Sequence, residues 1–291
     1  MSSVVRVNSV VITGASTGIG AACALHLDAL GFRVFAGVRK LEDGDLLKAR
    51  GSQRLLPVLL DVTDDVSIAQ AAARVKEAVG NAGIAGLVNN AGIAVAGPLE
   101  VLPIAELRKQ FDVNVIGQVA VTQAFLPLLR EGRGRIVNMG SIAGRATMPF
   151  LGPYSMSKFA LEAMTTALRL ELDCWGIEVS IVEPGASATP IWEKSTKAAD
   201  LLQATTVHEA LPLYAEHLAC VRRAIDEAAR RAISVDAVAQ AVEHALTARR
   251  PKTHYLVGSD AKFRAFLALL LPHRMQDALL RWFLKFPRRR G

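Results

Sequence analysis

Near its N-terminus the chain passes from an apolar run into a glycine-rich turn, reading Val10-Val11-Ile12-Thr13-Gly14-Ala15-Ser16-Thr17-Gly18-Ile19-Gly20. The apolar run predicts a buried strand, and the Ala- and Leu-rich residues that follow predict a helix. Three glycines let the backbone turn tightly and approach a pyrophosphate, whose charge the N–H groups of a helix start attract. A strand, a glycine loop and a helix in this order predict a phosphate-binding loop; a tight turn without a ligand is the alternative.

The same alternation of strand and helix continues through most of the chain. Short β-branched runs predict strands at Val10–Thr13, Arg33–Gly37, Leu55–Leu60, Gly86–Asn89, Arg135–Met139, Ile177–Val182 and His254–Val257. Helical stretches between them are predicted at Ile19–Leu30, Val66–Val79, Ile104–Leu129, Tyr154–Cys174 and Val235–Ala248. Strands joined by helical crossovers form parallel sheets. We therefore expect an α/β protein with a doubly wound, seven-stranded parallel sheet of the Rossmann type.

Composition favours one large core. Hydrophobic residues make up 51% of 291 residues and charged residues 21%, with no repeat or Ser/Gly-rich linker to mark a domain boundary. We predict one core without an internal domain boundary, and a separate C-terminal extension over 259–291. Residues 190–233 lack a strand pattern and follow a strand end, so they are expected to form a loop or helical cover over a ligand site.

Cysteine usage and apolar run lengths bear on location. Only Cys23, Cys174 and Cys220 occur, too few and too far apart for a disulfide framework. No signal-peptide pattern is visible at the N-terminus. The apolar run at Ala265–Leu271 ends at Pro272 and is much shorter than the ~20 residues of a spanning helix. These features predict a cytoplasmic protein in a reducing compartment, with no transmembrane segment.

The end of the second strand bears on cofactor choice. It reads Ala36-Gly37-Val38-Arg39-Lys40, with no carboxylate where NAD-preferring proteins bind the ribose 2′-hydroxyl. A guanidinium can pair with a 2′-phosphate, so Arg39 favours NADP(H) and leaves NAD(H) as the second choice. A solvated loop residue is the alternative for Arg39. Asp61, after the third strand, is expected either to accept from the adenine amino group or to cap the next helix.

At these and later positions the chain resembles the short-chain dehydrogenases/reductases. The resemblance covers residues 8–258 and rests on Thr13-Gly14-x-x-x-Gly18-Ile19-Gly20, Asp61-Val62, Asn89-Asn90-Ala91-Gly92, Asn114, Ser141, Tyr154-x-x-x-Lys158 and Pro184-Gly185 in one order. It is strongest toward the steroid- and retinol-dehydrogenase branch. It implies a Rossmann-type domain that uses NAD(P)(H) to interconvert an alcohol and a carbonyl.

Hydride transfer to or from a carbon requires a proton donor or acceptor at its oxygen. Tyr154 is the candidate, and Lys158, one helical turn later, is expected to lower the phenol pKa. Ser141 is expected to hydrogen-bond the substrate oxygen. The resemblance implies that Lys158 also holds the nicotinamide ribose and that Asn114 supports a proton path to it. Singly, these residues also occur as helix pairs, caps and backbone-bonding side chains.

The remaining cofactor contacts follow from the resemblance. They are expected at Gly14, Ser16, Thr17, Gly18, Ile19, Gly20, Arg39, Asp61, Val62, Asn90, Ala91, Gly92, Tyr154, Lys158, Pro184, Gly185 and Thr189. Asn90 has a second reading, as a bridge between neighbouring strands. The sequence departs from the family by placing Ala186-Ser187-Ala188 where bulkier residues are common, which leaves the pocket shape open.

Metal and hydrolase chemistry have no sequence support. The six histidines form no pair with acids at metal-ligand spacing, so no metal site is predicted. No Gly-x-Ser-x-Gly elbow occurs either, which removes the α/β-hydrolase reading of the same architecture.

The positive charge lies in the tail. The net charge is +7, and from Arg249 onward 11 Lys and Arg stand against two acids, so the body is not a nucleic-acid-binding surface. Apolar stripes starting at Phe263 and Met275 predict two basic amphipathic helices. They are expected to pack on their own domain or a partner subunit, or to contact an anionic membrane surface.

Together these features predict an NADP(H)-dependent oxidoreductase of a hydrophobic alcohol or carbonyl, such as a steroid, retinoid or long-chain compound. The alternative is a catalytically silent dinucleotide-binding scaffold or sensor at a membrane surface. The family's helices at Ile104–Leu129 and Tyr154–Cys174 usually form subunit contacts. The resemblance therefore implies a homodimer or homotetramer.

Overall fold

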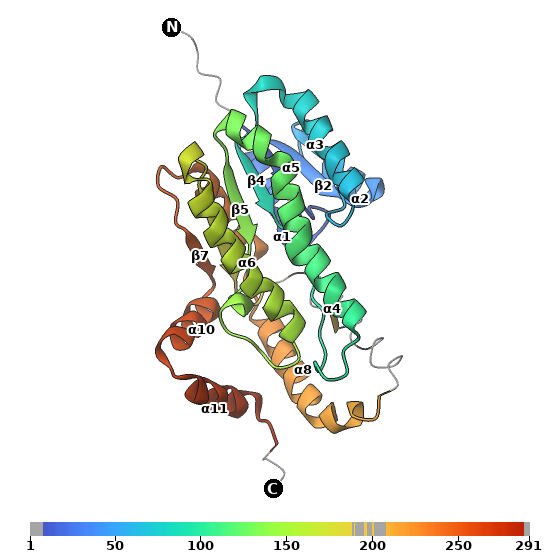
Figure 1. The fold of residues 1–291 in the computed structure, drawn as a ribbon, viewed down its shortest axis with the longest axis vertical. Helices are drawn as coiled ribbons and strands as arrows, with labels where there is room; N and C mark the ends of the chain where they lie inside the picture. Colours follow the sequence, from blue (N-terminus) through green and yellow to red (C-terminus); the bar gives the residue numbers. More distant parts are fainter. Residues whose placement is uncertain (1–7, 188, 190–194, 197–199, 201–207, 288–291) are drawn as a thin grey trace.

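A computed structural model describes residues 8–187, 189, 195, 196, 200 and 208–287. Its centre is a sheet of seven parallel strands in the order β3-β2-β1-β4-β5-β6-β7 (Figure 1). The strands are β1 (Ser9–Ile12), β2 (Arg33–Val38), β3 (Leu55–Leu59), β4 (Gly86–Asn89), β5 (Arg135–Met139), β6 (Val179–Pro184) and β7 (His254–Val257). The predicted fold class is confirmed, and each strand is found within two residues of its predicted bounds.

Helices cover both faces of the sheet. On one face α1 (Gly18–Ala29) and α9 (Val235–Thr247) bury apolar residues such as Leu27 and Val242 against the strands. On the other face lie α3 (Asp65–Val79), α5 (Gly117–Gly132) and α6 (Gly152–Glu171) (Figure 1). Their core includes Val75 and Phe125. The strand order reverses between β1 and β4, and in open parallel sheets ligands bind beyond the strand ends at such a point.

Helix α4 (Ile104–Phe111), a π-helical turn (Asp112–Ile116) and α5 form one continuous helix. Side chains along it bind the end of β4 and the irregular backbone that follows, in four contacts: Gln110 Oε1 with Val95 N–H (2.7 Å), Asn114 Oδ1 with Ile93 N–H (2.9 Å), Gln118 Nε2 with Ala91 O (3.1 Å) and Thr122 Oγ1 with the side-chain Nδ2 of Asn89 (2.9 Å). We call these contacts the polar ladder. Four residues of a helix span about 6 Å and two residues of an extended segment about 6.6 Å. Side chains four residues apart on the helix therefore lie opposite positions two residues apart on the extended segment.

By length and apolar composition the helix over 104–132 could cross a membrane. In this fold 44% of its most apolar window is buried within the protein, and the polar ladder faces inward. Such a helix is a core element of the α/β domain.

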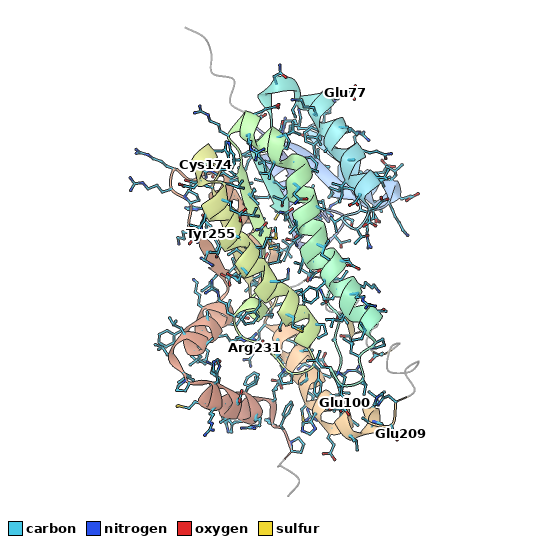
Figure 2. The ribbon with its side chains drawn as sticks, viewed as in Figure 1. Glu77, Glu100, Cys174, Glu209, Arg231 and Tyr255 are labelled. Atoms are coloured by element: carbon cyan, nitrogen blue, oxygen red, sulfur yellow. The ribbon has the colours of Figure 1, made fainter. Side chains whose placement is uncertain are left out.

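One helix was not predicted, and another falls where a loop or helical cover was predicted. Helix α2 (Leu41–Lys48) exposes most of its residues and has no clear apolar stripe. Helix α8 (Ala215–Arg230) lies within the predicted cover over 190–233, where Trp192, Leu201 and Leu202 are outside the described residues. Figure 2 shows Glu209 and Glu100 near the outer end of α8 and Arg231 at its inner end.

The two predicted tail helices are present as α10 (Ser259–Leu270) and α11 (His273–Leu284). They lie at the same end of the molecule as α8 (Figure 1). Ala261 and Leu284 are buried, and the Phe286 ring packs edge-on against His217 of α8 with centroids 4.8 Å apart. The tail therefore packs on its own domain by part of its surface. Its large apolar side chains remain exposed at Phe263, Phe266, Leu269, Leu270, Met275, Leu279, Trp282 and Phe283.

Candidate active site

The glycine loop has the geometry that its sequence predicts. Gly14 and Gly18 adopt φ values of +64° and +59°, which side-chain-bearing residues rarely take. A Cβ on Gly20 would lie 2.3 Å from the Gly14 carbonyl oxygen, so no side chain fits there. Helix α1 starts at Gly18, and its N-cap residue, Thr17, makes no side-chain capping bond. The first N–H groups of α1 are thus free of a competing cap.

Ser16 is half-buried in this loop, and Thr17 is exposed at its tip. Ile19 packs partly buried against the core beneath α1. The predicted loop contacts therefore share one surface at the switch point of the sheet.

Asn90 joins this loop to the end of β4. Its Nδ2 donates to the carbonyl oxygens of Thr13 (2.9 Å) and Gly14 (3.0 Å). The backbone N–H groups of Asn90 and Ala91 both donate to the Thr13 hydroxyl at 2.9 Å. The strand-bridging reading of Asn90 is confirmed, and Ala91 lies against Gly14, where a Cβ would be 2.8 Å from the Ala91 Cα.

Arg39 and Asp61 lie at the ends of two paired strands, β2 and β3. Arg39 is exposed. The Asp61 Oδ1 atom accepts from the N–H (2.9 Å) and hydroxyl (2.7 Å) of Thr63. Asp64, not Asp61, caps α3 by accepting from Val66 N–H and Ser67 N–H. The alternative that Asp61 caps the next helix is wrong, because α3 begins at Asp65, three residues later than a cap at Asp61 requires.

Val62, the neighbour of Asp61, is buried beneath Gly117 of α5. The Cβ that Gly117 lacks would lie 2.5 Å from the Val62 carbonyl oxygen. Gly92, at the far side of the site, faces the Asn114 amide at ordinary van der Waals distance.

Ser141, Tyr154 and Lys158 come together beyond the end of β5. The Lys158 ammonium lies 5.6 Å from the centroid of the Tyr154 ring and donates to the Met139 carbonyl at 2.7 Å. Tyr154 is 6% exposed and hydrogen-bonded to Ser141. The Ser141 Oγ also accepts from Ala143 N–H at 3.1 Å, which fixes the turn after β5. A serine, a phenol and an ammonium thus share one partly closed site.

The pKa of the phenol differs from expectation. Burial raises the pKa of Tyr154, and the hydrogen bond with Ser141 opposes this rise. Burial lowers the pKa of Lys158 to about 8. The expected net lowering of the Tyr154 pKa is therefore wrong for the chain's own groups, because desolvation raises that pKa. The Lys158 ammonium itself donates to the Met139 carbonyl.

Asn114 is fully buried in the π-helical turn. Its Nδ2 donates to the Ile93 carbonyl (3.0 Å) and to Ser157 Oγ (3.1 Å), and Ser157 Oγ donates to the Tyr154 carbonyl (2.7 Å). The structure therefore links Asn114 to the backbone of the helix that carries Tyr154. Its relay of protons stays a prediction.

The end of β6 forms the opposite wall. Gly185 follows Pro184, and its N–H donates to the Val257 carbonyl at 2.9 Å. Thr189 is half-buried, with its N–H bonded to the Ser187 carbonyl at 2.8 Å. The open side of Gly185 faces Asp260 of α10, a neighbour that the sequence did not point to.

A buried charged cluster behind the site was also missed. The Arg145 guanidinium binds both carboxylate oxygens of Glu183, a residue with no exposed surface, and lies 3.8 Å from Glu162. His254 Nε2 lies 3.2 Å from the same Glu162 carboxylate. These acids and His254 are close enough to share a metal ion, but the guanidinium already supplies the cation there.

The charged cluster joins three segments that carry site residues. Arg145 follows Ser141, Glu162 lies one turn beyond Lys158, and Glu183 precedes Pro184. A charged residue inside the apolar strand run before Pro184 was the one available sequence signal.

The residues at the switch point fit a dinucleotide. The glycine cradle excludes a Cβ at Gly20, and the uncapped N–H groups of α1 present partial positive charge suited to a pyrophosphate. Ser141 follows β5, and Tyr154 of α6 is hydrogen-bonded to it. This arrangement can hold a nicotinamide cofactor and exchange a proton at a carbonyl oxygen.

Comparison with known proteins agrees with this geometry. The chain is 40% identical to retinol dehydrogenase 5 of Mus musculus over 95% of this chain and 88% of that protein. It is 37% identical to an NADPH-dependent 3-dehydrocapnine reductase of Ornithobacterium rhinotracheale, over 92% of this chain and 94% of that protein. A solved short-chain dehydrogenase from Streptomyces avermitilis superposes with a TM-score of 0.77 at 31% identity, covering 97% of each chain.

A second solved structure, a short chain dehydrogenase from Burkholderia cenocepacia in complex with NADP, has a TM-score of 0.72 at 27% identity, covering 94% of this chain and 98% of that one. The family model described as short chain dehydrogenase matches residues 8–200. The glycine cradle, the Ser141, Tyr154 and Lys158 site and these matches lead to one conclusion: the chain belongs to the short-chain dehydrogenase family, the oxidoreductases of CH–OH groups.

Proposed function

We propose that this oxidoreductase interconverts a hydrophobic alcohol and its carbonyl with NADP(H). The observation that carries the proposal is the meeting of Ser141, which follows β5, with Tyr154 and Lys158 of α6. The bound nicotinamide would supply or accept the hydride. The rest of the chemistry falls to side chains of this chain.

In the reducing direction the Tyr154 hydroxyl gives its proton to the carbonyl oxygen as the hydride reaches the carbon. A phenol whose pKa is raised by burial is protonated at neutral pH, so it is ready to donate. Ser141, already bonded to Tyr154, can donate its own hydrogen bond to the same oxygen and hold it in place. Lys158 keeps a positive charge beside the ring and stabilises the tyrosinate that forms.

The central test of this mechanism is the variant Tyr154→Phe. It should retain NADPH binding, measured by fluorescence, and lose about a hundredfold to ten-thousandfold in kcat, because the general acid is absent. Turnover at the wild-type rate would overturn the mechanism. Turnover that is absent in the wild type as well, with NADPH still bound, would favour a dinucleotide-binding scaffold.

The preference for NADP(H) is supported by Arg39. Its side chain is exposed at the end of β2, and neither Val38 nor Arg39 offers the carboxylate that binds a ribose 2′-hydroxyl. The Ornithobacterium relative is named as NADPH-dependent, which agrees. Arg39→Asp should reverse the preference between NADPH and NADH in kcat/KM, with Arg50→Asp, an exposed arginine after α2, as the matched control.

The hydrophobic substrate is supported by two observations. Retinol dehydrogenases are among the relatives at about 40% identity. The tail near the site also exposes large apolar side chains. A panel of retinoid, steroid and long-chain aldehydes and ketones, compared with short polar ketones at equal concentration, would test this. Higher kcat/KM for the short polar ketones would contradict it.

Peripheral docking of the tail on an anionic membrane, in the cytoplasmic compartment, is part of the proposal. Trp282 is 76% exposed and Phe266 57%, and exposed basic residues flank them at Lys262, Arg274, Arg281 and Lys285. Aromatic and basic side chains on one helical surface suit the interface of an anionic bilayer. The cysteines are free, which suits a reducing compartment.

Co-sedimentation with phosphatidylserine-containing vesicles would test the docking. Trp282→Asp with Phe266→Asp should abolish binding of the full chain. Leu46→Asp, on the exposed face of α2, should leave it unchanged. No binding by the wild type ends the membrane proposal.

Self-association through α5 and α6 is the remaining part. Large apolar side chains are exposed at Ile116 (59%), the last residue of the π-helical turn before α5, and at Phe159 (45%) of α6. A homodimer or homotetramer would cover them. Ile116→Glu with Phe159→Glu should shift the mass measured by light scattering to that of a monomer.

A further inference from the structure

The first turn of α10 reaches into the wall of the proposed active site. The Asp260 carboxylate occupies the space that Gly185 and Gly258 leave open: a Cβ on Gly185 would lie 2.2 Å from its oxygens, and one on Gly258 would lie 2.5 Å away. Gly258 also has a φ of +105°, which lets the chain turn from β7 into α10. Two glycines therefore make room for one carboxylate from the tail.

Asp260 holds a specific peptide group. Its Oδ2 accepts from the Ala186 N–H at 2.9 Å, directly after the Pro184-Gly185 pair. The Ala186 carbonyl accepts from the Ile233 N–H at 2.8 Å, and Ser187 pairs with Ile233 as an isolated bridge. The backbone after β6 is thus fixed from one side by the tail and from the other by the residue that precedes α9.

A second side chain of α10 reaches the neighbouring wall. Arg264, one helical turn after Asp260, donates from Nη2 to the Ala146 carbonyl at 2.8 Å. Ala146 lies in the loop that starts at Ser141, next to Arg145. Burial lowers the pKa of Arg264, and the Asp260 charge opposes this. Asp260 and Arg264 therefore face the domain from one side of α10, and each binds a different active-site loop.

We propose that Asp260 and Arg264 are positioning residues, through which α10 sets the loops that carry Ser141 and follow Pro184-Gly185. This inference rests on the proposed function. The two side chains act on the site through the Ala186 N–H and the Ala146 carbonyl. The tail helix is then a part of the active-site wall and not an appendage to the domain.

The first test compares Asp260→Ala with Asp260→Asn in the full chain. Asp260→Ala removes the acceptor for the Ala186 N–H and should lower kcat by about tenfold to a hundredfold, since small misplacements of reacting groups cost this much. Asp260→Asn keeps an acceptor in the same place and should restore kcat to within about threefold of the wild type. Asp277→Ala, which removes an exposed aspartate of α11, is the control.

Loss of folded protein would lower kcat as well, so NADPH binding is measured alongside. The glycine cradle of β1 and α1 would hold the pyrophosphate, so Asp260→Ala should still bind one NADPH per chain. Its Kd should rise by a smaller factor than kcat falls, because only the contacts after Pro184 are disturbed. Arg264→Met should lower kcat similarly, and Arg264→Lys should retain part of it. Wild-type kcat in both Asp260→Ala and Arg264→Met would overturn the proposal.

Hydrogen exchange separates this inference from the proposed function. In Asp260→Ala the amide of Ala186 should exchange at least about tenfold faster, while amides of β1 keep their rates. If the wild type reduces no carbonyl but this acceleration is seen, the proposed function fails and the positioning role of Asp260 stands. If carbonyls are reduced and the Ala186 amide keeps its exchange rate in Asp260→Ala, the positioning role alone fails.

Discussion

Glu162 of the charged cluster offers a sharp test of the electrostatics behind the active site. Burial, and then the negative charge of Glu183, raise the pKa of Glu162 from 4.5 to about 8, against the opposing effect of Arg145. The groups that face it are Glu183, Arg145 and His254. Glu162→Gln keeps the shape of the protonated acid and removes its titration.

The sign follows from proton linkage. Between pH 4.5 and about 8 the folded chain keeps the Glu162 proton and the unfolded chain releases it. The stabilisation is therefore complete below pH 4.5 and is lost as the pH rises through about 8. Each unit of pKa difference between the folded and unfolded chains corresponds to about 1.4 kcal/mol in the free energy of unfolding. The Glu162 side chain is 19% exposed. We expect a loss of about 2 to 4 kcal/mol between pH 5 and 8.5 that Glu162→Gln does not show.

The assay is urea unfolding of the wild type and Glu162→Gln at pH 5, 7 and 8.5. The slope of the unfolding free energy against urea concentration should be the same for both proteins. The variant should match the wild type within about 1 kcal/mol at pH 5 and exceed it by about 2 to 4 kcal/mol at pH 8.5. Glu171→Gln, an exposed glutamate on the same helix, should show no pH-dependent difference. A difference between Glu162→Gln and wild type that stays constant over this range would refute the reasoning.

Three further outcomes follow from the site. Gly20→Ala should raise the Kd for NADPH at least about tenfold in a fluorescence titration, because its Cβ would collide with the Gly14 carbonyl. The rate of carbonyl reduction should fall as the pH rises through about 8, where Lys158 loses its proton, and Lys158→Met should be slow at every pH. Glu183→Ala should cost about 3 to 5 kcal/mol in urea unfolding, because it leaves the Arg145 guanidinium without its buried partner.

The fold was predictable because its signals are local. A run such as Val10–Ile12 followed by glycines, or Tyr154 and Lys158 one turn apart, contains the structural information within a few residues. Helix α2 gave no such signal, because its residues are mostly exposed and packing, not periodicity, holds it in place.

The missed parts of the site depend on contacts between distant segments. Arg145 and Glu183 are 38 residues apart, and Asp260 lies 74 residues from Ala186. Nothing near Asp260 in the sequence shows that Gly185 leaves room for its carboxylate. The raised pKa of Tyr154 was missed for a similar reason: the spacing to Lys158 is visible in the sequence, whereas the depth of burial is not.

The π-helical turn at Asp112–Ile116 determines in which direction around the helix axis the side chains of α5 point. Each α-helical residue advances about 100° around the axis, so deleting one residue there would restore a regular helix. It would rotate Gln118 and Thr122 away from the Ala91 carbonyl and the Asn89 side chain that they bind. These two contacts of the polar ladder would then be lost while the cofactor loop kept its own sequence. The extra residue thus works as a spacer, and a chain that lost it would misalign an active site in which every catalytic side chain was still present.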